Sequence, residues 1–375
     1  MEIEEYVKNI LNDIKSGGID AVSEYSKKFD GYGMPFKVPE SEFAEAKELI
    51  PVYQKDIINR TYKRIYENHA IQYNNDKVRF SRGSIYGIRY TPIERIGMYI
   101  PGKKPLPSTV MMIGIPAKIA GVRDIVIVSA PESNGRVNPY TLYIAGLLGI
   151  HEVYRIGGVQ AIGSMAYGIG MKKVDKIFGP GNSYVNEAKR QVYGFTGIDG
   201  LYGPSEVMVI SDGTAKDEYI LADLNSQLEH GITSKAWLLT TGKAISTAGN
   251  ERIEVMVFEN MDELISKANE IAPEHMEIQA KDPMGIFSRI KNAGAIYIGE
   301  YAPVPAGDYF LGVNHLLPTG GTSRFSSALT VDDFMKKTSF ASVSREDFMA
   351  DRELGLELAK IEGMPLHYKS MEARL

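Results

Sequence analysis

The first part of the chain carries apolar residues at helical spacing, beginning with Ile3, Val7, Ile10, Leu11 and Ile14. A repeat of three to four residues places such side chains on one face of a helix. Further helices are expected over 20–29 and 40–50, and Pro51 suits the start of another that runs to about residue 73. The pattern therefore predicts a helical N-terminal segment over residues 1–84.

From residue 85 the pattern changes to strands that alternate with helices. Residues 86–90 alternate like a strand, and further strands are expected at 124–129, 152–156 and 176–178. Helices are expected between them, at 109–120, 139–148 and 161–167. This βαβ order predicts a parallel sheet and a first α/β domain over residues 85–200.

A second cycle of the same kind follows, with strands expected at 207–210, 236–239, 253–258 and 295–298. The fold class is therefore α/β, with two similar doubly wound, incomplete Rossmann-like domains. The boundary near residue 200 is taken from three nearby glycines, and the second domain is expected over 201–326. A C-terminal helical segment is expected over 327–375.

Composition narrows the range of functions. With 44% hydrophobic and 24% charged residues, the 375-residue chain has a globular composition. Its net charge of -5 offers no basic field for nucleic acid. The chain has no cysteine, so a metal would need nitrogen and oxygen ligands. An acidic N-terminus and the lack of a long apolar run predict a cytoplasmic protein without a membrane partner.

Histidines beside acids or amides are the candidates for chemistry. Gln227 and His230 stand three residues apart at the end of an expected helix, so both could ligate one ion, although a histidine often simply closes a helix. Glu274 and His275 supply two proton-transfer groups after the next helix. The alternative for that pair is a solvated surface.

Two further histidines lie near the C-terminus. In the glycine-rich region 307–321, Asp308 offers an oxygen ligand and His315 a nitrogen donor or base. A turn aspartate and a packed histidine are the alternatives. His367 follows Glu362 by five residues, and a ligand role there needs partners from elsewhere; the alternative is an exposed terminal histidine.

Glycine-rich turns at 97–102, 157–160 and 179–182 lack the G-x-G-x-x-G fingerprint. Each follows an expected strand and precedes a helix, which is the geometry in which backbone amides can bind a pyrophosphate. Taken one at a time, they also fit ordinary turns.

From about Glu94 to the C-terminus, the ordered motifs resemble the histidinol dehydrogenase family. The shared segments are Tyr99-Ile100-Pro101-Gly102, Pro107-Ser108-Thr109-Val110, Gly157-Gly158-Val159-Gln160-Ala161, Gly179-Pro180-Gly181-Asn182, Gly203-Pro204-Ser205-Glu206, Gln227-Leu228-Glu229-His230, Ala272-Pro273-Glu274-His275, 314–321 and 362–367. So many motifs in one order do not agree by chance.

The resemblance implies a metal site, a substrate and a cofactor. Zn²⁺ would be held by Gln227, His230, Asp308 and His367, with His367 supplied by the partner of a homodimer. The substrate would be L-histidinol, and NAD would lie beside Tyr99, Gln160 and Asn182 in the first α/β domain. Substrate contacts would come from Ser205, Gln227, His230, His275, Asp308, Glu362 and His367.

The implied reaction is the last step of histidine biosynthesis, a four-electron oxidation through L-histidinaldehyde to L-histidine with two NAD. His275 is the expected base, because alcohol oxidation releases a proton from oxygen while a hydride leaves carbon. Glu274 would activate the water that adds to the aldehyde. His315 would support the substrate or the acid-base network.

The chain departs from the family pattern in three places. The turn 99–105 is one residue short, the segment 239–253 is shortened, and Gly231 follows His230 where an aspartate is common. Three other functions remain open: a zinc hydrolase with Glu274 as base, a relative that oxidises another amino or sulfonated alcohol, and a catalytically silent binding protein.

Overall fold

The computed structural model describes residues 2–102, 104–247 and 249–374. They form two compact units, one of residues 1–72 with 93–334 and the other of residues 73–92 with 335–375. Over the described residues, no helix is both long and apolar enough to cross a lipid bilayer. Lys103 of the shortened turn and Ala248 of the shortened 239–253 segment lie outside these residues.

A five-stranded parallel sheet forms the centre of the first α/β half. Its strand order is β5-β4-β3-β6-β7, the 3-2-1-4-5 order of a doubly wound fold. In chain order the strands are β3 (Arg95–Ile100), β4 (Asp124–Ser129), β5 (Glu152–Tyr154), β6 (Lys176–Phe178) and β7 (Gly197–Ile198). The helices between and around them are α4 (Pro107–Ile119), α5 (Pro139–Leu147), α6 (Gly158–Tyr167) and α7 (Ser183–Val192).

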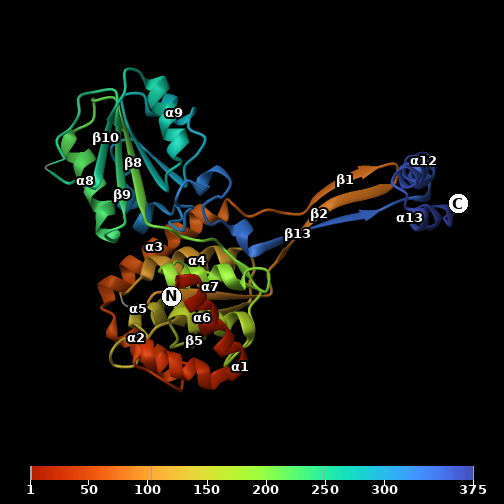
Figure 1. Ribbon diagram of the computed structural model, residues 1–375, viewed down its shortest axis with the longest axis horizontal. Helices are drawn as coiled ribbons and strands as arrows, with labels where there is room; N and C mark the ends of the chain where they lie inside the picture. The colour runs from red at the N-terminus through yellow and green to blue at the C-terminus, as the bar shows by residue number, and fades with distance from the viewer. Residues whose placement is uncertain (1, 103, 248, 375) are drawn as a thin grey trace. The chain divides into compact units, whose positions relative to one another are not determined.

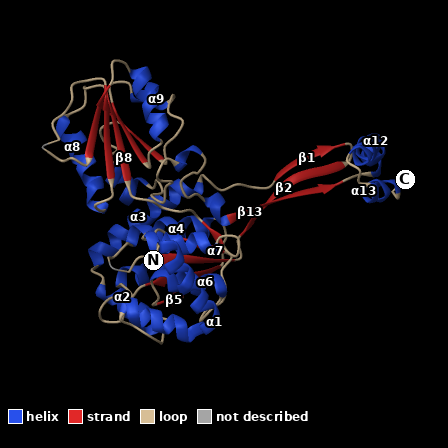
Figure 2. Ribbon diagram, viewed as in Figure 1, coloured by secondary structure: helices blue, strands red, loops and turns tan. Residues whose placement is uncertain are grey.

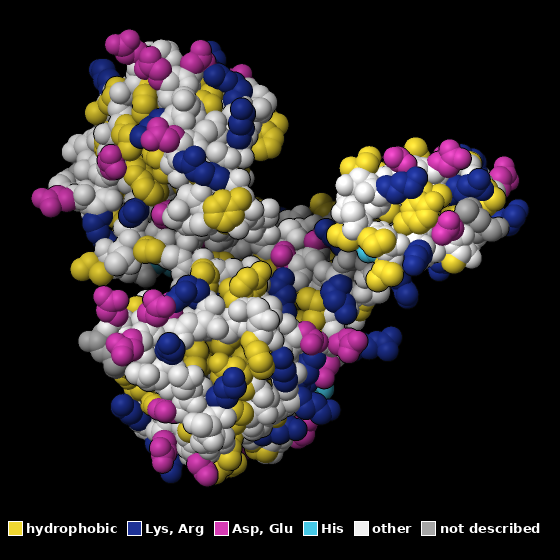
Figure 3. Space-filling view, turned by 45° about the vertical axis from the view of Figure 1, so that its right-hand side comes forward, with side chains coloured by type: hydrophobic (Ala, Val, Ile, Leu, Met, Phe, Trp, Pro, Cys, Tyr) yellow, Lys and Arg dark blue, Asp and Glu magenta, His cyan; other side chains and the backbone are white. Residues whose placement is uncertain are grey.

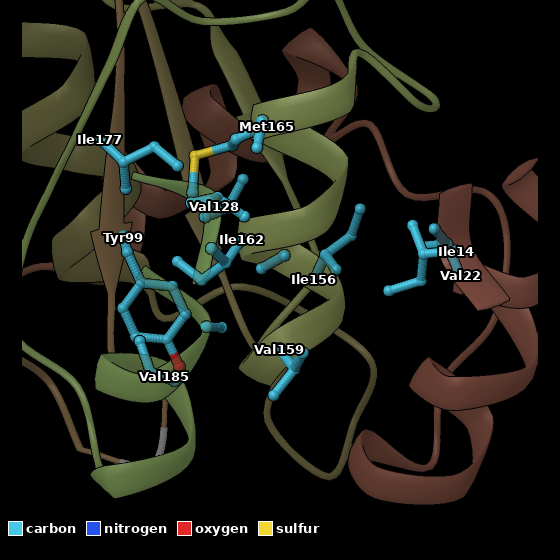
Figure 4. Packing of buried hydrophobic residues seen from close by; sticks show 14 of the residues in the cluster. Ile14, Val22, Tyr99, Val128, Ile156, Val159, Ile162, Met165, Ile177 and Val185 are labelled. Carbon is cyan, nitrogen blue, oxygen red and sulfur yellow. The ribbon is translucent and has the colours of Figure 1, made fainter. Parts of the chain in front are cut away.

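One face of this sheet is covered by α6, α7 and the first helix, α1 (Ile3–Asp30). Figure 4 shows Ile14 of α1 and Ile162 of α6 in the same apolar cluster as Val128 of the sheet. The amphipathic N-terminal segment is thus built into the core of the first half. Two further helices, α2 (Glu40–Leu49) and α3 (Val52–Ala70), pack against α5 and α4.

The second α/β half repeats the arrangement. Its parallel sheet has the order β10-β9-β8-β11-β12, which is again 3-2-1-4-5. The strands are β8 (Glu206–Ser211), β9 (Lys235–Thr240), β10 (Ile253–Val257), β11 (His275–Gln279) and β12 (Ala295–Ile298). Its helices are α8 (Asp217–Gln227), α9 (Met261–Ile271), α10 (Pro283–Phe287) and α11 (Val304–Ala306).

Helices α8 and α9 cover opposite faces of the second sheet (Figures 1 and 2). A 3-10 turn, Leu228–His230, extends α8, and a π-helical turn, Gly307–Leu311, extends α11. Shorter 3-10 turns lie at Thr322–Arg324 and Val331–Phe334. The doubly wound prediction is therefore confirmed for both halves.

The second unit is a three-stranded antiparallel sheet followed by two helices. The strands, in the order β1-β2-β13, are β1 (Lys77–Ser81), β2 (Ser84–Pro92) and β13 (Met335–Ser342). The helices are α12 (Arg345–Ile361) and α13 (Pro365–Glu372). Asp347 of α12 accepts hydrogen bonds from Arg82 Nε and the Tyr86 hydroxyl, which ties the helices to the sheet.

The structure sharpens several expected elements and adds others. Strands expected at 124–129, 176–178 and 295–298 occupy those residues, whereas the strand expected over 152–156 ends at Tyr154. Strands β3 and β11 were not expected, although β3 is the centre of its sheet. Strands β1 and β13 add sheet to terminal segments that were expected to be helical. The proposed domain boundary at residue 200 stays a prediction, since both sheets belong to one compact unit.

Candidate active site

A pocket of about 680 Å³ in the first unit brings together residues that are far apart in the sequence. Four of its walls carry predicted site residues: the segment before β8, the end of α8, the start of β11 and the π-helical turn. The predicted residues that line it are Ser205, His230, Glu274, His275, Asp308 and His315. The apolar side of the pocket comes from α3 and from the segment before α4, including Ile57, Ile58 and Leu106.

His275 is the first residue of β11, and the backbone before it sets its position. Helix α9 ends at Ala272, which has a left-handed φ of 55°, and Pro273 then leads the chain towards the sheet. A non-glycine residue with positive φ is uncommon and is stabilised by its surroundings. The reversal places Glu274 and His275, both buried, at the amino ends of the strands.

Hydrogen bonds fix the tautomer of His275. Its Nδ1 lies 3.0 Å from the carbonyl oxygen of Glu206 and 3.4 Å from Glu274 Oε2. Both partners are acceptors when Glu274 is ionised, so Nδ1 carries the hydrogen and Nε2 keeps its lone pair. His275 Nε2 is buried and has no hydrogen-bond partner among the described residues. The ring therefore presents an unused base in the wall of the pocket.

The charge of His275 is governed by opposing effects. Burial lowers its pKa, but the hydrogen bond with Glu274 and the charges of Glu274 and Asp308 outweigh burial and raise the pKa above its ordinary value. Glu274 is itself held in place, because its Oε2 accepts from the backbone N–H of Glu206 at 2.8 Å. Glu206 thus orients both residues through its backbone.

His315 is a different kind of histidine. Burial lowers its pKa despite the opposite effect of Asp308, so the ring is neutral near pH 7. Its Nδ1 lies 3.3 Å from the carbonyl oxygen of Asp308, and its Nε2 lies 3.3 Å from the Thr109 hydroxyl. His315 therefore braces the π-helical turn that carries Asp308 against the start of α4.

Gln227 and His230 close α8 as predicted. They are separated by a 3-10 turn, in which side chains three residues apart are aligned. His230 is exposed at the pocket, whereas Gln227 is buried behind it and does not line it. Gln227 Nε2 has no hydrogen-bond partner among the described residues. Since the two ends of an amide exchange by rotation, an oxygen at that position would be an unused ligand.

No metal cluster is evident within one unit. Over residues 2–102, 104–247 and 249–374, no group of three or more histidine and acidic side chains is close enough to hold a metal ion. The predicted set places only two such side chains, His230 and Asp308, in one subunit, because Gln227 is an amide and His367 is expected from the partner subunit. Glu362 ends α12 and His367 lies in α13, both exposed in the second unit.

A second pocket, of about 950 Å³, lies at the carboxyl ends of the first sheet. It brings together Tyr99, Gln160 and Asn182, the three residues predicted to contact NAD. Gln160 Nε2 donates to Asp30, whereas Gln160 Oε1 is buried and has no partner among the described residues. Gly181 lines both pockets, so the turn between β6 and α7 forms part of the wall of each cavity.

A buried ion pair holds that turn. Lys189 Nζ lies 2.6 Å from Asp199 Oδ1, with both side chains fully buried, and donates to the carbonyl oxygen of Gly179 at 2.9 Å. The other Asp199 oxygen accepts from the Gly179 N–H and the Tyr202 hydroxyl. Gly179 has a φ of 121°, which favours glycine. One network thus supports a wall of each pocket.

Sequence reasoning gave no role to several residues that support these pockets: Asp30, Lys189, Asp199, Tyr202 and Glu206. Glu206 belongs to a motif that was recognised, and an acid inside an otherwise apolar strand was the available signal. For Asp30 and Lys189 the signal is absent, because their partners lie far away in the sequence or on another element.

Comparisons with known proteins agree with this geometry. The family model described as histidinol dehydrogenase matches residues 1–257 and 243–375. A histidinol dehydrogenase of Thermococcus kodakarensis is 58% identical over 373 residues, with 99% of each chain covered. One of Heliobacterium mobile is 40% identical, covering 98% of this chain and 93% of its own.

Solved structures agree at the level of the whole fold. The crystal structure of histidinol dehydrogenase from Elizabethkingia anophelis has a TM-score of 0.95 and 34% identity, covering 100% of this chain and 92% of its own. An acetylating aldehyde dehydrogenase from Geobacillus thermoglucosidasius, at 13% identity and a TM-score of 0.51, shares the fold alone. The resemblance found in the motifs is confirmed, and the chain belongs to the histidinol dehydrogenase family.

Proposed function

We propose that this chain oxidises L-histidinol through L-histidinaldehyde to L-histidine, with Zn²⁺ bound and two NAD reduced. One observation carries the proposal: His275 offers an unpartnered Nε2 in the wall of a pocket that shares the wall residue Gly181 with a second, cofactor-sized cavity. A base in a pocket that neighbours such a cavity suits proton removal coupled to hydride transfer.

Gln227, His230 and Asp308, with His367, would hold the zinc ion. Zn²⁺ is intermediate between hard and soft metal ions and accepts nitrogen and oxygen ligands. An amide, imidazoles and a carboxylate therefore suit it in a chain without cysteine. The buried, unpartnered Nε2 end of the Gln227 amide supports this set, because a buried polar group without a partner is costly unless a ligand satisfies it. Bound zinc would supply a positive charge that orients the amino and imidazole nitrogens of the substrate.

Tyr99, Gln160 and Asn182 would hold NAD at the carboxyl ends of the first sheet. The free Gln160 Oε1 is an available acceptor for the cofactor. Asp30 is the only charged side chain among the described residues that line this pocket. Phosphates would therefore be bound by backbone amides of the glycine turns and not by arginine or lysine.

The first oxidation converts the primary alcohol to an aldehyde. His275 Nε2 takes the hydroxyl proton as the O–H bond breaks, and the carbon gives up a hydride to the cofactor. Glu274 and the Glu206 carbonyl hold the imidazole through Nδ1 and stabilise the positive charge that develops on it. The proton then passes to solvent before the second half of the reaction.

The second oxidation needs a water molecule. Glu274 lines the pocket and would take a proton from water as the water oxygen adds to the aldehyde carbon, so that the carbonyl oxygen becomes the alkoxide of the hydrate. His275 then removes a hydroxyl proton from the hydrate, a second hydride leaves the same carbon, and the product is the carboxylate of L-histidine.

Glu362 and His367 would reach this site from the partner subunit of a homodimer. The exposed apolar side chains of the second unit support an association, since apolar surface of this kind marks protein contacts. Figure 3 shows hydrophobic side chains on the visible face of this unit. The exposed large hydrophobic residues of α12 and α13 are Leu354, Leu358, Ile361 and Leu366.

The proposal is tested by incubating the purified chain with L-histidinol, NAD and Zn²⁺, and measuring NADH and L-histidine. About two NADH per histidine are expected from the two hydride transfers. A zinc hydrolase would form no NADH. An amino alcohol without an imidazole, such as phenylalaninol, should react far more slowly; equal rates would contradict histidinol as the substrate.

A further inference from the structure

A buried polar cluster lies on the face of β11 that α8 covers. Asp223, Glu277 and Gln279 are each at most 9% exposed, and none lines either of the two pockets. Gln279 Nε2 donates to Asp223 Oδ2 and to Glu277 Oε2, both at 2.7 Å. Burial of polar groups costs free energy, so three of them in an otherwise apolar layer indicate a specific role.

The register of β11 relates this cluster to the site. Side chains of a strand alternate between its faces, so His275, Glu277 and Gln279 point to one side of the sheet. Helix α8 packs on that side and places Asp223 and Gln227 four residues apart on one face of the helix. The pairing of Asp223 with Glu277 and Gln279 therefore fixes the rotation of α8 that decides where Gln227 points.

Glu277 also contacts the third element of the predicted metal site. Its Oε1 accepts from the backbone N–H of Val304 at 2.7 Å. Val304 is the first residue of α11, and Asp308 follows four residues later in the π-helical turn that continues α11. One carboxyl group thus joins β11, α8 and α11.

The charge state of the cluster is compatible with such a contact. Burial, helped by the charge of Asp223, raises the pKa of Glu277 well above its ordinary value, and burial also raises the pKa of Asp223. The two carboxyl groups therefore share a proton and hydrogen-bond to each other instead of repelling.

We infer that Asp223, Glu277 and Gln279 are positioning residues that hold Gln227 and Asp308 at the mutual positions needed to bind the metal. The inference rests on the proposed function, because it takes Gln227 and Asp308 as ligands. None of the three residues would touch the metal or the substrate.

The test is the affinity of the full chain for Zn²⁺, measured by competition with a chromogenic chelator. Glu277→Leu removes the contacts with both Asp223 and Val304 and should weaken zinc binding by about tenfold to a hundredfold, as expected for groups that orient ligands. Glu277→Gln keeps an acceptor for Val304 and a donor for Asp223, and should restore most of the affinity. NAD binding at the other pocket, measured by calorimetry, should not change.

Ile278→Ala is the matched control, because Ile278 is fully buried in the same strand but points to the opposite face, towards α9. It should unfold at a lower temperature and still bind zinc normally. Unchanged zinc affinity in Glu277→Leu, or an equal loss in Ile278→Ala, would overturn the inference. If Glu277→Leu does not fold, Gln279→Leu decides by the same criteria. Failure of the unaltered chain to bind zinc would instead refute the proposed metal site.

Discussion

The two α/β halves have the same strand order but place their pockets at opposite ends of their sheets. In the first half the pocket lies at the carboxyl ends, where Tyr99, Ala130 and Asn182 follow or end β3, β4 and β6. In the second half the pocket lies at the amino ends, where Ser205 precedes β8 and His275 begins β11.

The carboxyl ends of the second sheet are closed by their own loops. Asp212 accepts from the backbone N–H groups of Thr214 and Lys281. A Cβ on Gly242 would lie 2.7 Å from the Cα of Gly213, so the loops after β8 and β9 are in direct contact. Topology alone predicts a ligand at the carboxyl ends. The pocket of the first sheet lies at these ends, whereas the candidate active-site pocket lies at the amino ends of the second sheet.

The difference fits the two kinds of chemistry. Carboxyl ends followed by helix N-termini provide backbone amides for a nucleotide. The amino ends of the second sheet instead present the side chains of Glu274 and His275, both buried. If the first sheet binds NAD and the second carries the zinc and the acid-base groups, a change in one pocket should alter its own function and leave the other unchanged.

Removal of zinc should have the largest effect. Chelation should abolish NADH formation, and added Zn²⁺ should restore it, because ligands of nitrogen and oxygen release metal reversibly. Binding of NAD at the first sheet should persist in the metal-free chain when measured by calorimetry. Oxidation that continues without metal would contradict the role given to the second pocket.

His275→Asn should come next. It removes the base but leaves a side chain of similar size, and both oxidations should slow by about 10² to 10⁴. Zinc and NAD should still bind. The measurement is kcat for L-histidinol and for L-histidinaldehyde; a loss confined to one substrate would show that another group serves as base for the other.

Glu274→Gln should have a smaller and more selective effect. It removes the carboxylate expected to activate water, so oxidation of the aldehyde should slow by about 10². Oxidation of the alcohol should slow much less, since the amide still accepts from the Glu206 N–H. Equal losses for alcohol and aldehyde would mean that Glu274 acts only by orienting His275.

Asn182→Asp should have the smallest effect, and only on the first pocket. Asn182 caps α7 by accepting from the Val185 N–H at 3.1 Å, and aspartate keeps such a cap. The new carboxylate should repel the phosphates of NAD and compete with them for the helix N-terminus. The KM for NAD should therefore rise by about tenfold or less. Asn182→Ala, which loses the cap, is the control for stability. A fall in zinc affinity in either variant would break the separation of the two pockets.

The spacing of apolar residues was enough to predict an element that has one apolar face or that is a short, fully apolar strand. Strand β4 was predicted residue for residue, and the helices α4, α5 and α6 of the first half were predicted within a few positions. Strand β3 was missed because Gly97 interrupts the sequence of apolar residues in this fully buried strand. The missing side chain of Gly97 allows Met165 of α6 to pack against the sheet.

Strand β11 was missed for a reason related to function. Its inward residues, His275, Glu277 and Gln279, are polar, so the pattern of a buried strand is absent. Functional sites break local rules in this way, and the partners that stabilise Glu277 and Gln279 come from α8 and α11, which no local window includes. The motifs gave the candidate site residues, whereas the supporting contacts of Glu206 and Asp223 required the structure.

The central claim is that zinc binds at the amino ends of the second sheet and NAD at the carboxyl ends of the first. X-ray diffraction at the zinc absorption edge, from crystals grown with Zn²⁺ and NAD, tests it most directly. The account predicts one anomalous peak bonded to Gln227, His230 and Asp308 and to His367 of either protomer, with NAD density beside Tyr99, Gln160 and Asn182. A zinc peak elsewhere, or NAD at the second sheet, would contradict it.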